Sequence, residues 1–255
     1  MDLLVAGRRV EVYAVSGEEP ALVFLHEGLG SAGLWRGFDE LVAAATGQRV
    51  LAYSRAGHGW SDPADIPRSP DFMHHEALVV LPALLGQMEP SRPPILVGHS
   101  DGASIALIHA ASHPVSALVL LAPHVFVEPE SIAEIEAARV RFETTDLPER
   151  MARHHRDPAA TFYGWNDIWL DPEFRRWNIE DCLSAIDAPM LLIQGRDDEY
   201  GTLAQIDAIE AGVSGQVRRL ILEDCGHSPH LAQQKRVLEA VTRFVAESQE
   251  RRREA

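Results

Sequence analysis

Short apolar runs alternate with longer segments of mixed polarity along most of the chain. Three of the runs, at residues 22–25, 118–121 and 191–193, are continuously apolar. Strands that are buried on both faces have this pattern, because helices cover both sides of a parallel sheet. We expect strands at residues 10–15, 21–26, 50–53, 95–97, 117–121, 190–194 and 217–222.

The segments between these runs have the residue spacing of amphipathic helices. They predict helices near residues 34–45, 72–87, 103–113, 203–211 and 231–250. This alternation predicts the α/β class, with an open, doubly wound architecture whose central sheet is mostly parallel and covered by helices on both faces. A chain of 255 residues is long enough to bury one core of this kind.

Residues 123–188 interrupt the alternation. This stretch has no convincing strand, but it contains an acidic helical run, a cluster of His and Arg, and three of the five tryptophans. We predict a helical cap, or lid, at 123–188, inserted into a core made of residues 1–122 and 189–255. Its aromatic side chains could pack the cap onto the core, wall an apolar substrate pocket, or do both.

The chain is acidic, with 23 basic and 38 acidic residues and a formal net charge of −15. This argues against binding to nucleic acid or to an anionic membrane, because both need a basic face. Cys182 and Cys225 lack metal-ligand spacing and are expected to be free thiols. The sequence shows no signal peptide and no apolar window of the length a membrane span needs. We therefore expect a cytoplasmic protein that acts on a small molecule, as a monomer or a homodimer.

The segment Gly98-His99-Ser100-Asp101-Gly102 lies between an apolar run and a helical run. A strand, Gly-x-Ser-x-Gly and a helix in this order are typical of a nucleophile elbow, which turns the serine hydroxyl out of the sheet. The turn strains the backbone and crowds its neighbours, and the two glycines relieve the crowding. A helix that begins at the serine also favours negative charge beside the hydroxyl. The pattern predicts that Ser100 is a nucleophile.

Four more motifs follow predicted strands: HEGLG at 26–30, GHGWS at 57–61, GRDD at 195–198 and GH at 226–227. With the elbow and the predicted cap, they extend over nearly the whole chain. On these motifs the chain resembles the α/β-hydrolases, in particular the esterase-like branch with a serine nucleophile and a helical cap. The resemblance implies the α/β-hydrolase fold and a Ser-Asp-His triad, but no particular substrate.

His227 is the histidine best placed to act as the base that activates Ser100. It follows a predicted strand in a loop before the last helix, and His230 is the nearest alternative, expected to line or cap the entrance to the site. Asp198 stands at the fourth position of Gly-x-x-Asp, where the resemblance implies the acid that orients the histidine. Asp197 would be its neighbour on an acidic turn.

The resemblance also implies an oxyanion hole made of two backbone amides. One amide belongs to Asp101, the residue after the nucleophile, and the other to Gly28. Glu27 departs from the family's His-Gly pattern, and its carboxylate could repel an anionic substrate, hydrogen-bond a hydroxyl group or anchor the loop. Arg55 could bind a substrate carboxylate or tie loops together, and the side chain of Asp101 suits a helix cap.

These features predict a serine hydrolase that cleaves a small ester-like substrate through an acyl-enzyme, as a carboxylesterase does. Neither His-Glu-x-x-His nor a clustered Cys/His set occurs, so we expect no metal, and we expect no other cofactor.

Two alternatives remain open. One is a hydrolase of carbon–carbon bonds or a pyruvate-eliminating lyase of the same fold, of the aromatic-degradation or menaquinone-pathway type. Its carboxylate substrates would need arginines near Ser100, and the candidates are Arg55, Arg139, Arg141 and Arg153. The other is a ligand-binding receptor with vestigial hydrolase activity.

Overall fold

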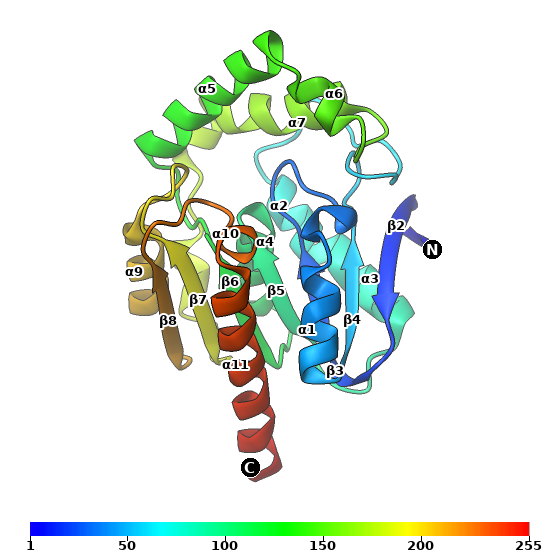
Figure 1. Ribbon diagram of the computed structural model, residues 1–255, viewed down its shortest axis with the longest axis vertical. Helices are drawn as coiled ribbons and strands as arrows, with labels where there is room; N and C mark the ends of the chain where they lie inside the picture. Colours follow the sequence, from blue (N-terminus) through cyan, green and yellow to red (C-terminus); the bar gives the residue numbers. More distant parts are fainter. Residues whose placement is uncertain (255) are drawn as a thin grey trace.

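A central sheet organises the protein, whose computed structural model describes residues 1–254 (Figure 1). Within these residues eight strands lie in the order β1-β2-β4-β3-β5-β6-β7-β8. Neighbouring strands from β4 to β8 are parallel, whereas β1 and β2 pair in antiparallel fashion. The predicted mostly parallel sheet is thereby confirmed. The strands are β1 (Asp2–Val5), β2 (Arg8–Val15), β3 (Glu18–Leu25), β4 (Gln48–Tyr53), β5 (Ile95–His99), β6 (Ala117–Leu121), β7 (Met190–Gly195) and β8 (Val217–Leu222).

Helices cover both faces of the sheet. On one face, in front of the sheet in Figure 1, α1 (Phe38–Thr46) and α11 (Gln234–Glu254) pack side by side. Short helical turns, η1 (Ala32–Trp35) and α10 (Pro229–Ala232), precede them. The other face is covered by α2 (Phe72–His75), the π-helical turn η2 (Glu76–Val80), α3 (Leu81–Met88), α4 (Asp101–Ala110) and α9 (Leu203–Gly212). No helix within residues 1–254 is both long and apolar enough to cross a lipid bilayer.

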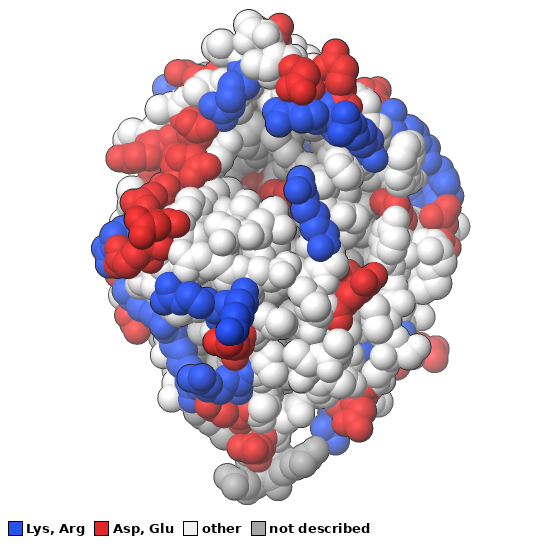
Figure 2. Space-filling model, in the orientation of Figure 1, with Lys and Arg blue, Asp and Glu red and all other residues white. Residues whose placement is uncertain are grey.

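The segment between β6 and β7, residues 123–188, is helical. Figure 1 shows α5 (Pro129–Thr144), α6 (Leu147–Met151) and α7 (Pro158–Leu170) beyond the carboxyl ends of the parallel strands, and α5 packs against α7. Figure 2 shows that the surface is hollowed beneath them. The segment also contains η3 (Phe174–Arg176) and α8 (Glu180–Leu183).

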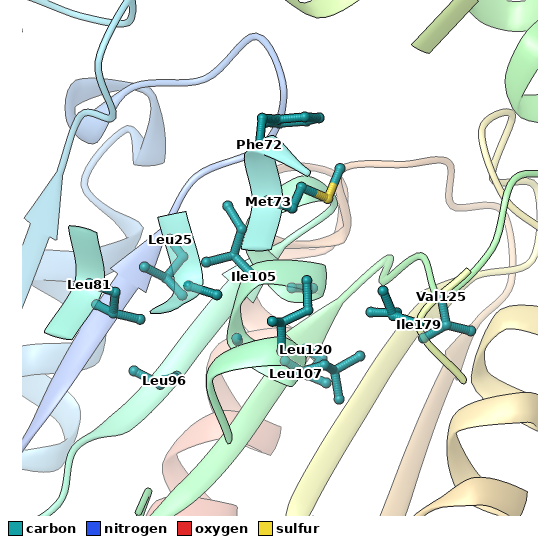
Figure 3. Close-up of a cluster of buried hydrophobic side chains, with 14 of the residues drawn as sticks. Leu25, Phe72, Met73, Leu81, Leu96, Ile105, Leu107, Leu120, Val125 and Ile179 are labelled. Atoms are coloured by element: carbon teal, nitrogen blue, oxygen red, sulfur yellow. The ribbon is translucent and has the colours of Figure 1, made fainter. Parts of the chain in front are cut away.

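Side chains of the central strands alternate between two cores. In β3, Leu22 and Phe24 join the core under α1 and α11, whereas Val23 and Leu25 join the core on the opposite face. The second core extends from Leu25 to Met73 of α2 (Figure 3). Both faces of each central strand are covered, which explains why these strands are continuously apolar in the sequence.

Two elements differ from the sequence prediction. β1 was not expected, because only Val5 of its four residues is buried and an exposed edge strand has no apolar pattern. The helix expected near 34–45 is divided into η1 and α1. Arg36 and Gly37, between them, have φ angles of 52° and 81°, which a right-handed helix cannot contain.

The first turn of α4 lies directly against the end of β3. A Cβ atom on Gly102 would be 2.0 Å from the carbonyl oxygen of Leu25, and one on Gly98 would be 2.5 Å from the Cα of Ala103. No side chain can occupy either position without moving backbone. The two glycines therefore allow α4 to begin where β5 ends.

We predict that Gly102→Ala destabilises the protein by about 2–3 kcal/mol, because the added methyl group must displace backbone in a close-packed core. Gly86, inside α3, is the matched control, since a Cβ there would have nothing within 4 Å. Gly86→Ala should be neutral or stabilising by up to about 1 kcal/mol. Urea unfolding measures both changes, and an unchanged free energy of unfolding for Gly102→Ala would contradict the close approach.

Candidate active site

Ser100 stands at the turn between β5 and α4. Its backbone has φ 53° and ψ −121°, which is a strained conformation for a residue with a side chain. The turn is fixed by a hydrogen bond of 2.9 Å from the Ser100 amide to the carbonyl of Leu121, at the end of β6. The strain directs the hydroxyl away from the sheet and toward the loops at the carboxyl ends of the strands.

The structure brings Ser100, His227 and Asp198 together from the ends of three strands. His227, in the loop after β8, has its Nε2 atom 2.9 Å from Ser100 Oγ. Its Nδ1 atom lies 2.8 Å from Oδ1 and 2.9 Å from Oδ2 of Asp198, which follows β7. Because the carboxylate accepts a hydrogen bond from Nδ1–H, the lone pair of Nε2 faces the serine hydroxyl. This arrangement can move a proton from Ser100 to His227.

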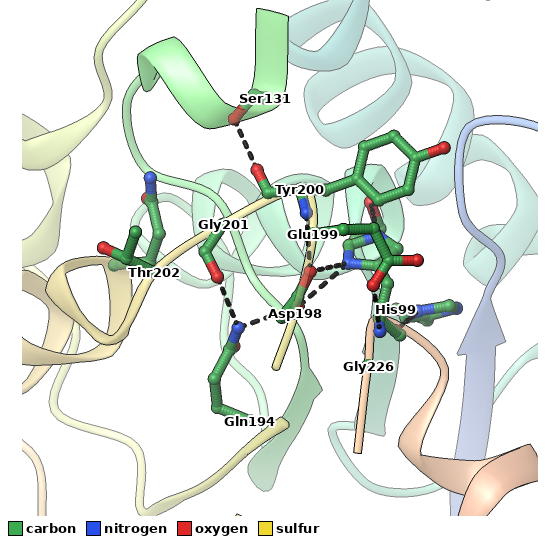
Figure 4. Close-up of polar contacts among 12 residues, drawn as sticks. His99, Ser131, Gln194, Asp198, Glu199, Tyr200, Gly201, Thr202 and Gly226 are labelled. Carbon is green, nitrogen blue, oxygen red and sulfur yellow. Dashed lines mark hydrogen bonds and ion pairs between the residues drawn. The ribbon is translucent and has the colours of Figure 1, made fainter. Parts of the chain in front are cut away.

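The carboxylate of Asp198 is buried and fully hydrogen-bonded. Oδ2 accepts a bond of 2.8 Å from Gln194 Nε2, and Oδ1 accepts one of 2.9 Å from the amide of Tyr200 (Figure 4). Burial acts to raise the pKa of Asp198, but the charge of His227 and the hydrogen bonds outweigh it and lower the pKa below its usual value. Asp198 is therefore ionised and can stabilise a charged imidazole.

The electrostatic environment favours the protonated form of His227. Burial acts to lower its pKa, but the charge of Asp198 and the hydrogen bond to it, with further contributions from Glu199 and Glu27, raise the pKa above its usual value. Glu199 also holds the backbone of this loop, since its Oε2 accepts a bond of 3.2 Å from the amide of His227 (Figure 4).

Gly28 and Asp101, the residues expected to supply the oxyanion-hole amides, both line the cavity at Ser100. Neither amide makes a hydrogen bond to another group within residues 1–254. Asp101 is the first residue of α4, so its amide lies at the positive end of the helix dipole. A Cβ on Gly28 would be only 2.2 Å from the indole nitrogen of Trp165 in α7, so only glycine fits there.

A cavity of about 190 Å³ opens above Ser100. Its floor is formed by loops after β3, β5, β7 and β8, and its cover by α5 and α7 of the 123–188 segment. The residues that line it are Glu27, Gly28, Leu29, Ser100, Asp101, His124, Ser131, Ile135, Trp165, Trp169, Glu199, Tyr200, His227 and Ser228.

A second chain of contacts reaches His227 from Glu27. His99 Nε2 donates a hydrogen bond of 2.7 Å to the carbonyl of His227, and His99 Nδ1 lies 3.3 Å from Glu27 Oε2. Burial acts to raise the pKa of Glu27. The hydrogen bond to His99 and the electrostatic interaction with that histidine outweigh burial and lower the pKa of Glu27 to about 2. Glu27 therefore remains ionised at the cavity wall while it holds the loop of His227 through His99.

Arg55 ties loops together, which was one of the two roles left open for it. Its buried guanidinium donates to the carbonyls of His26 and Glu27, the latter at 2.9 Å. In the cap segment, Arg139 binds Asn166 and Asp167, and Arg141 pairs with Glu134. None of the four candidate arginines, Arg55, Arg139, Arg141 and Arg153, lines the cavity above Ser100.

Two expectations about side chains are wrong. Asp101 does not cap α4, because its carboxylate accepts a hydrogen bond of 3.2 Å from Trp169 Nε1. His230 does not line the entrance but is buried against Trp35 and Phe38, with ring centroids 5.0 and 5.6 Å away. Burial lowers the pKa of His230 to about 3, so it is neutral there.

Several contacts of the site were missed from the sequence. Gln194, Tyr200 and His99 lie next to the predicted residues in the sequence, and proximity to Gly-x-x-Asp or to the elbow is the signal that could have found them. Trp165 and Trp169 come from α7, and their contacts carry no sequence signal beyond the aromatic run. Residues 28–33 have the spacing Gly-x-Gly-x-x-Gly after β3. A dinucleotide site needs a long helix after these glycines, but here they lead into the short turn η1.

Comparison with known proteins gives relatives with hydrolase names. The sn-1-specific diacylglycerol lipase ABHD11 of Mus musculus is 27% identical and aligns with 89% of this chain and 81% of its own length. Monoglyceride lipase of Mus musculus is 28% identical over 72% of this chain and 67% of its own length. Protein phosphatase methylesterase 1 of Homo sapiens is 32% identical over 42% of this chain, but only 28% of its own length.

Solved structures share the fold. A membrane phospholipase A described as a bacterial virulence factor superposes with a TM-score of 0.79 at 19% identity, over 98% of this chain and 86% of that one. A meta-cleavage product hydrolase from Pseudomonas fluorescens IP01 gives 0.72 at 20% identity, over 97% and 98%. The profile of the Alpha/beta hydrolase family matches residues 22–240, which include strands from β3 to β8. This protein belongs to the Alpha/beta hydrolase family.

Proposed function

We propose that this protein is a serine hydrolase that cleaves a small carboxylic ester. The single observation that carries the proposal is the hydrogen-bonded series from Ser100 Oγ to His227 Nε2, at 2.9 Å, and from His227 Nδ1 to Asp198, at 2.8 Å. A serine hydroxyl is a weak nucleophile until a base accepts its proton, and this series supplies the base and orients it.

The reaction has two acyl transfers. Ser100 Oγ attacks the ester carbonyl while His227 takes the hydroxyl proton, and the amides of Gly28 and Asp101 stabilise the negative oxygen. The carbon–oxygen bond of the ester then breaks, and His227 gives its proton to the alcohol. In the second transfer, water attacks the acyl-enzyme, His227 takes a proton from the water, and the acid and free Ser100 are released.

Two observations favour an ester over the alternatives. Two relatives that align with most of this chain have lipase names, and lipases cleave esters. Among the described residues, no arginine lines the cavity above Ser100, whereas substrates of carbon–carbon hydrolases and pyruvate-eliminating lyases carry carboxylates that need one. A pure ligand-binding protein has no need of a serine held against a base.

The helices of residues 123–188 act in this proposal as a cap that excludes water and selects the substrate. They contribute Ser131, Ile135, Trp165 and Trp169 to the cavity wall. Exclusion of water strengthens the electrostatic interactions on which the oxyanion hole depends.

Labelling with a fluorophosphonate, followed by mapping of the modified peptide, tests the proposed function. We expect the label on Ser100 and its loss in His227→Ala, because the reagent needs an activated serine. Ser100→Ala should lower the hydrolysis of 4-nitrophenyl acetate by about 10⁶-fold without changing the unfolding transition. A Ser100→Ala variant that hydrolysed 4-nitrophenyl acetate at the rate of the unmodified protein would contradict the proposal.

The pH dependence of kcat/KM follows from the raised pKa of His227. The histidine must be neutral to accept the Ser100 proton, so we expect an acidic limb with a midpoint above the ordinary histidine value of 6.5. Asp198→Asn removes the charge that raises this pKa, and should move the limb to lower pH and reduce kcat by about 10⁴-fold. A limb at the same pH in both proteins would show that Asp198 does not control His227.

The contact between Gly28 and Trp165 links the cap to the oxyanion position. Gly28→Ala forces its methyl group against the indole, and displacement of the loop should lower kcat/KM by about 10²-fold. Adding Trp165→Leu to Gly28→Ala makes room and should restore part of the rate, measured against Trp165→Leu alone. Equal rates for Gly28→Ala and the unmodified protein would contradict this link.

A further inference from the structure

The cavity above Ser100 combines acidic and aromatic walls. Within residues 1–254, neither lysine nor arginine lines it. A cavity with this composition differs from the usual apolar pocket with a few neutral polar groups. The acidic residues are Glu27, Asp101 and Glu199, and the aromatic residues are Trp165, Trp169 and Tyr200.

Neither of the two histidines that line the cavity carries a positive charge in the form of the enzyme that begins the reaction. Burial lowers the pKa of His124 to about 3, so its imidazole is neutral. His227 must be neutral to begin the reaction. Burial raises the pKa of Asp101, although Arg55 and Arg68 act to lower it, so the negative potential inside the cavity comes mainly from Glu27 and Glu199.

Glu27 and Glu199 both line the cavity, Glu27 from the loop after β3 and Glu199 from the loop after β7. The side chain of Glu27 is 29% exposed and pairs with His99, not with an arginine or a lysine. Glu199 is exposed and accepts the amide of His227. Figure 2 shows acidic atoms inside the hollow beneath the cap, while basic side chains stand on its rim. A carboxylate ligand entering this space would meet like charge, which is unfavourable at short distance.

The aromatic rings offer a binding surface for a cation. The rings of Trp165 and Tyr200 meet edge to face, with centroids 6.3 Å apart and planes at 63°. Trp169 completes the wall and is fixed through its bond to Asp101. Faces of tryptophan and tyrosine attract cations that have lost water, and alkylated ammonium groups suit them best because they are large and weakly hydrated.

We propose that the ester substrate carries an alkylammonium group, which is bound in this cavity by Trp165, Trp169 and Tyr200 together with the carboxylates of Glu27 and Glu199. The inference deepens the proposed function and rests on it, since the cavity is the one above Ser100. The group can belong to the alcohol or to the acyl part of the ester, and paired substrates distinguish the two.

The test uses esters that differ only in charge. Acetylcholine and 3,3-dimethylbutyl acetate differ by a nitrogen in place of a carbon and probe the alcohol part. The 4-nitrophenyl esters of 4-(trimethylammonio)butanoate and 5,5-dimethylhexanoate probe the acyl part in the same way. In at least one pair we expect kcat/KM for the cation to exceed that for the neutral ester by about tenfold or more. No preference in either pair would overturn the inference.

Variants that remove one carboxylate charge test which residue causes the preference for the cationic ester. Glu199→Gln should reduce the ratio of cationic to neutral kcat/KM by about threefold or more. Because both esters are measured with the same variant, any effect of Glu199 on the His227 loop changes both values of kcat/KM and cancels in their ratio. Asp197→Asn is the matched control, because this neighbouring carboxylate is exposed and does not line the cavity, and its ratio should stay within about twofold of the unmodified protein. Equal losses in the two variants would show a general charge effect and overturn the assignment to the cavity.

Failure of the proposed function gives a different result. If no ester is cleaved and fluorophosphonate does not label Ser100, the hydrolase proposal fails, and binding decides the inference alone. Calorimetry on Ser100→Ala then compares choline with 3,3-dimethylbutan-1-ol. Choline binding about tenfold more tightly would support an ammonium site without esterase chemistry, and equal or weaker binding would overturn it.

Discussion

The structure depends on the direct contact between the start of α4 and the ends of β3 and β5. Gly102 lies so close to the carbonyl of Leu25 that a methyl group would be 2.0 Å from it. This contact forces the chain to turn within one residue, and Ser100 takes a positive φ as a result. The same turn places the positive end of α4 beside the serine hydroxyl. The close packing of α4 on the sheet therefore also produces the turn that directs the Ser100 hydroxyl away from the sheet.

Two carboxylates around this turn each face a histidine. Asp198 faces His227, and Glu27 faces His99, which in turn binds the carbonyl of His227. An ionised carboxylate in a protein interior needs a partner of this kind to offset the loss of water. The two pairs hold the side chain and the backbone of His227 from separate directions. A histidine fixed in this way needs little reorganisation when it takes up a proton, which is the condition for efficient general-base chemistry.

The helical segment of residues 123–188 completes the surroundings of Ser100. α7 brings Trp165 against Gly28 and Trp169 against Asp101, so one helix touches both residues that we propose form the oxyanion hole. The rings of this segment also pack on one another, as in the stacked pair Phe142 and Phe162 with centroids 4.0 Å apart. The aromatic run thus contributes both to the packing of this segment and to the wall of the cavity.

The sequence by itself determined the order of strands and helices and the residues that stand at the carboxyl ends of β5, β7 and β8. Apolar runs and glycine positions are local properties, so the chain's own pattern predicted Ser100 and His227 at strand ends, while the family resemblance singled out Asp198. The tertiary structure alone decided which side chains meet across the sheet and the cap. The pairing of His99 with Glu27, the burial of His230 and the contact of Trp165 with Gly28 join residues from distant parts of the chain. Such contacts depend on how whole elements pack in three dimensions, and periodicity along one element carries no information about its partner.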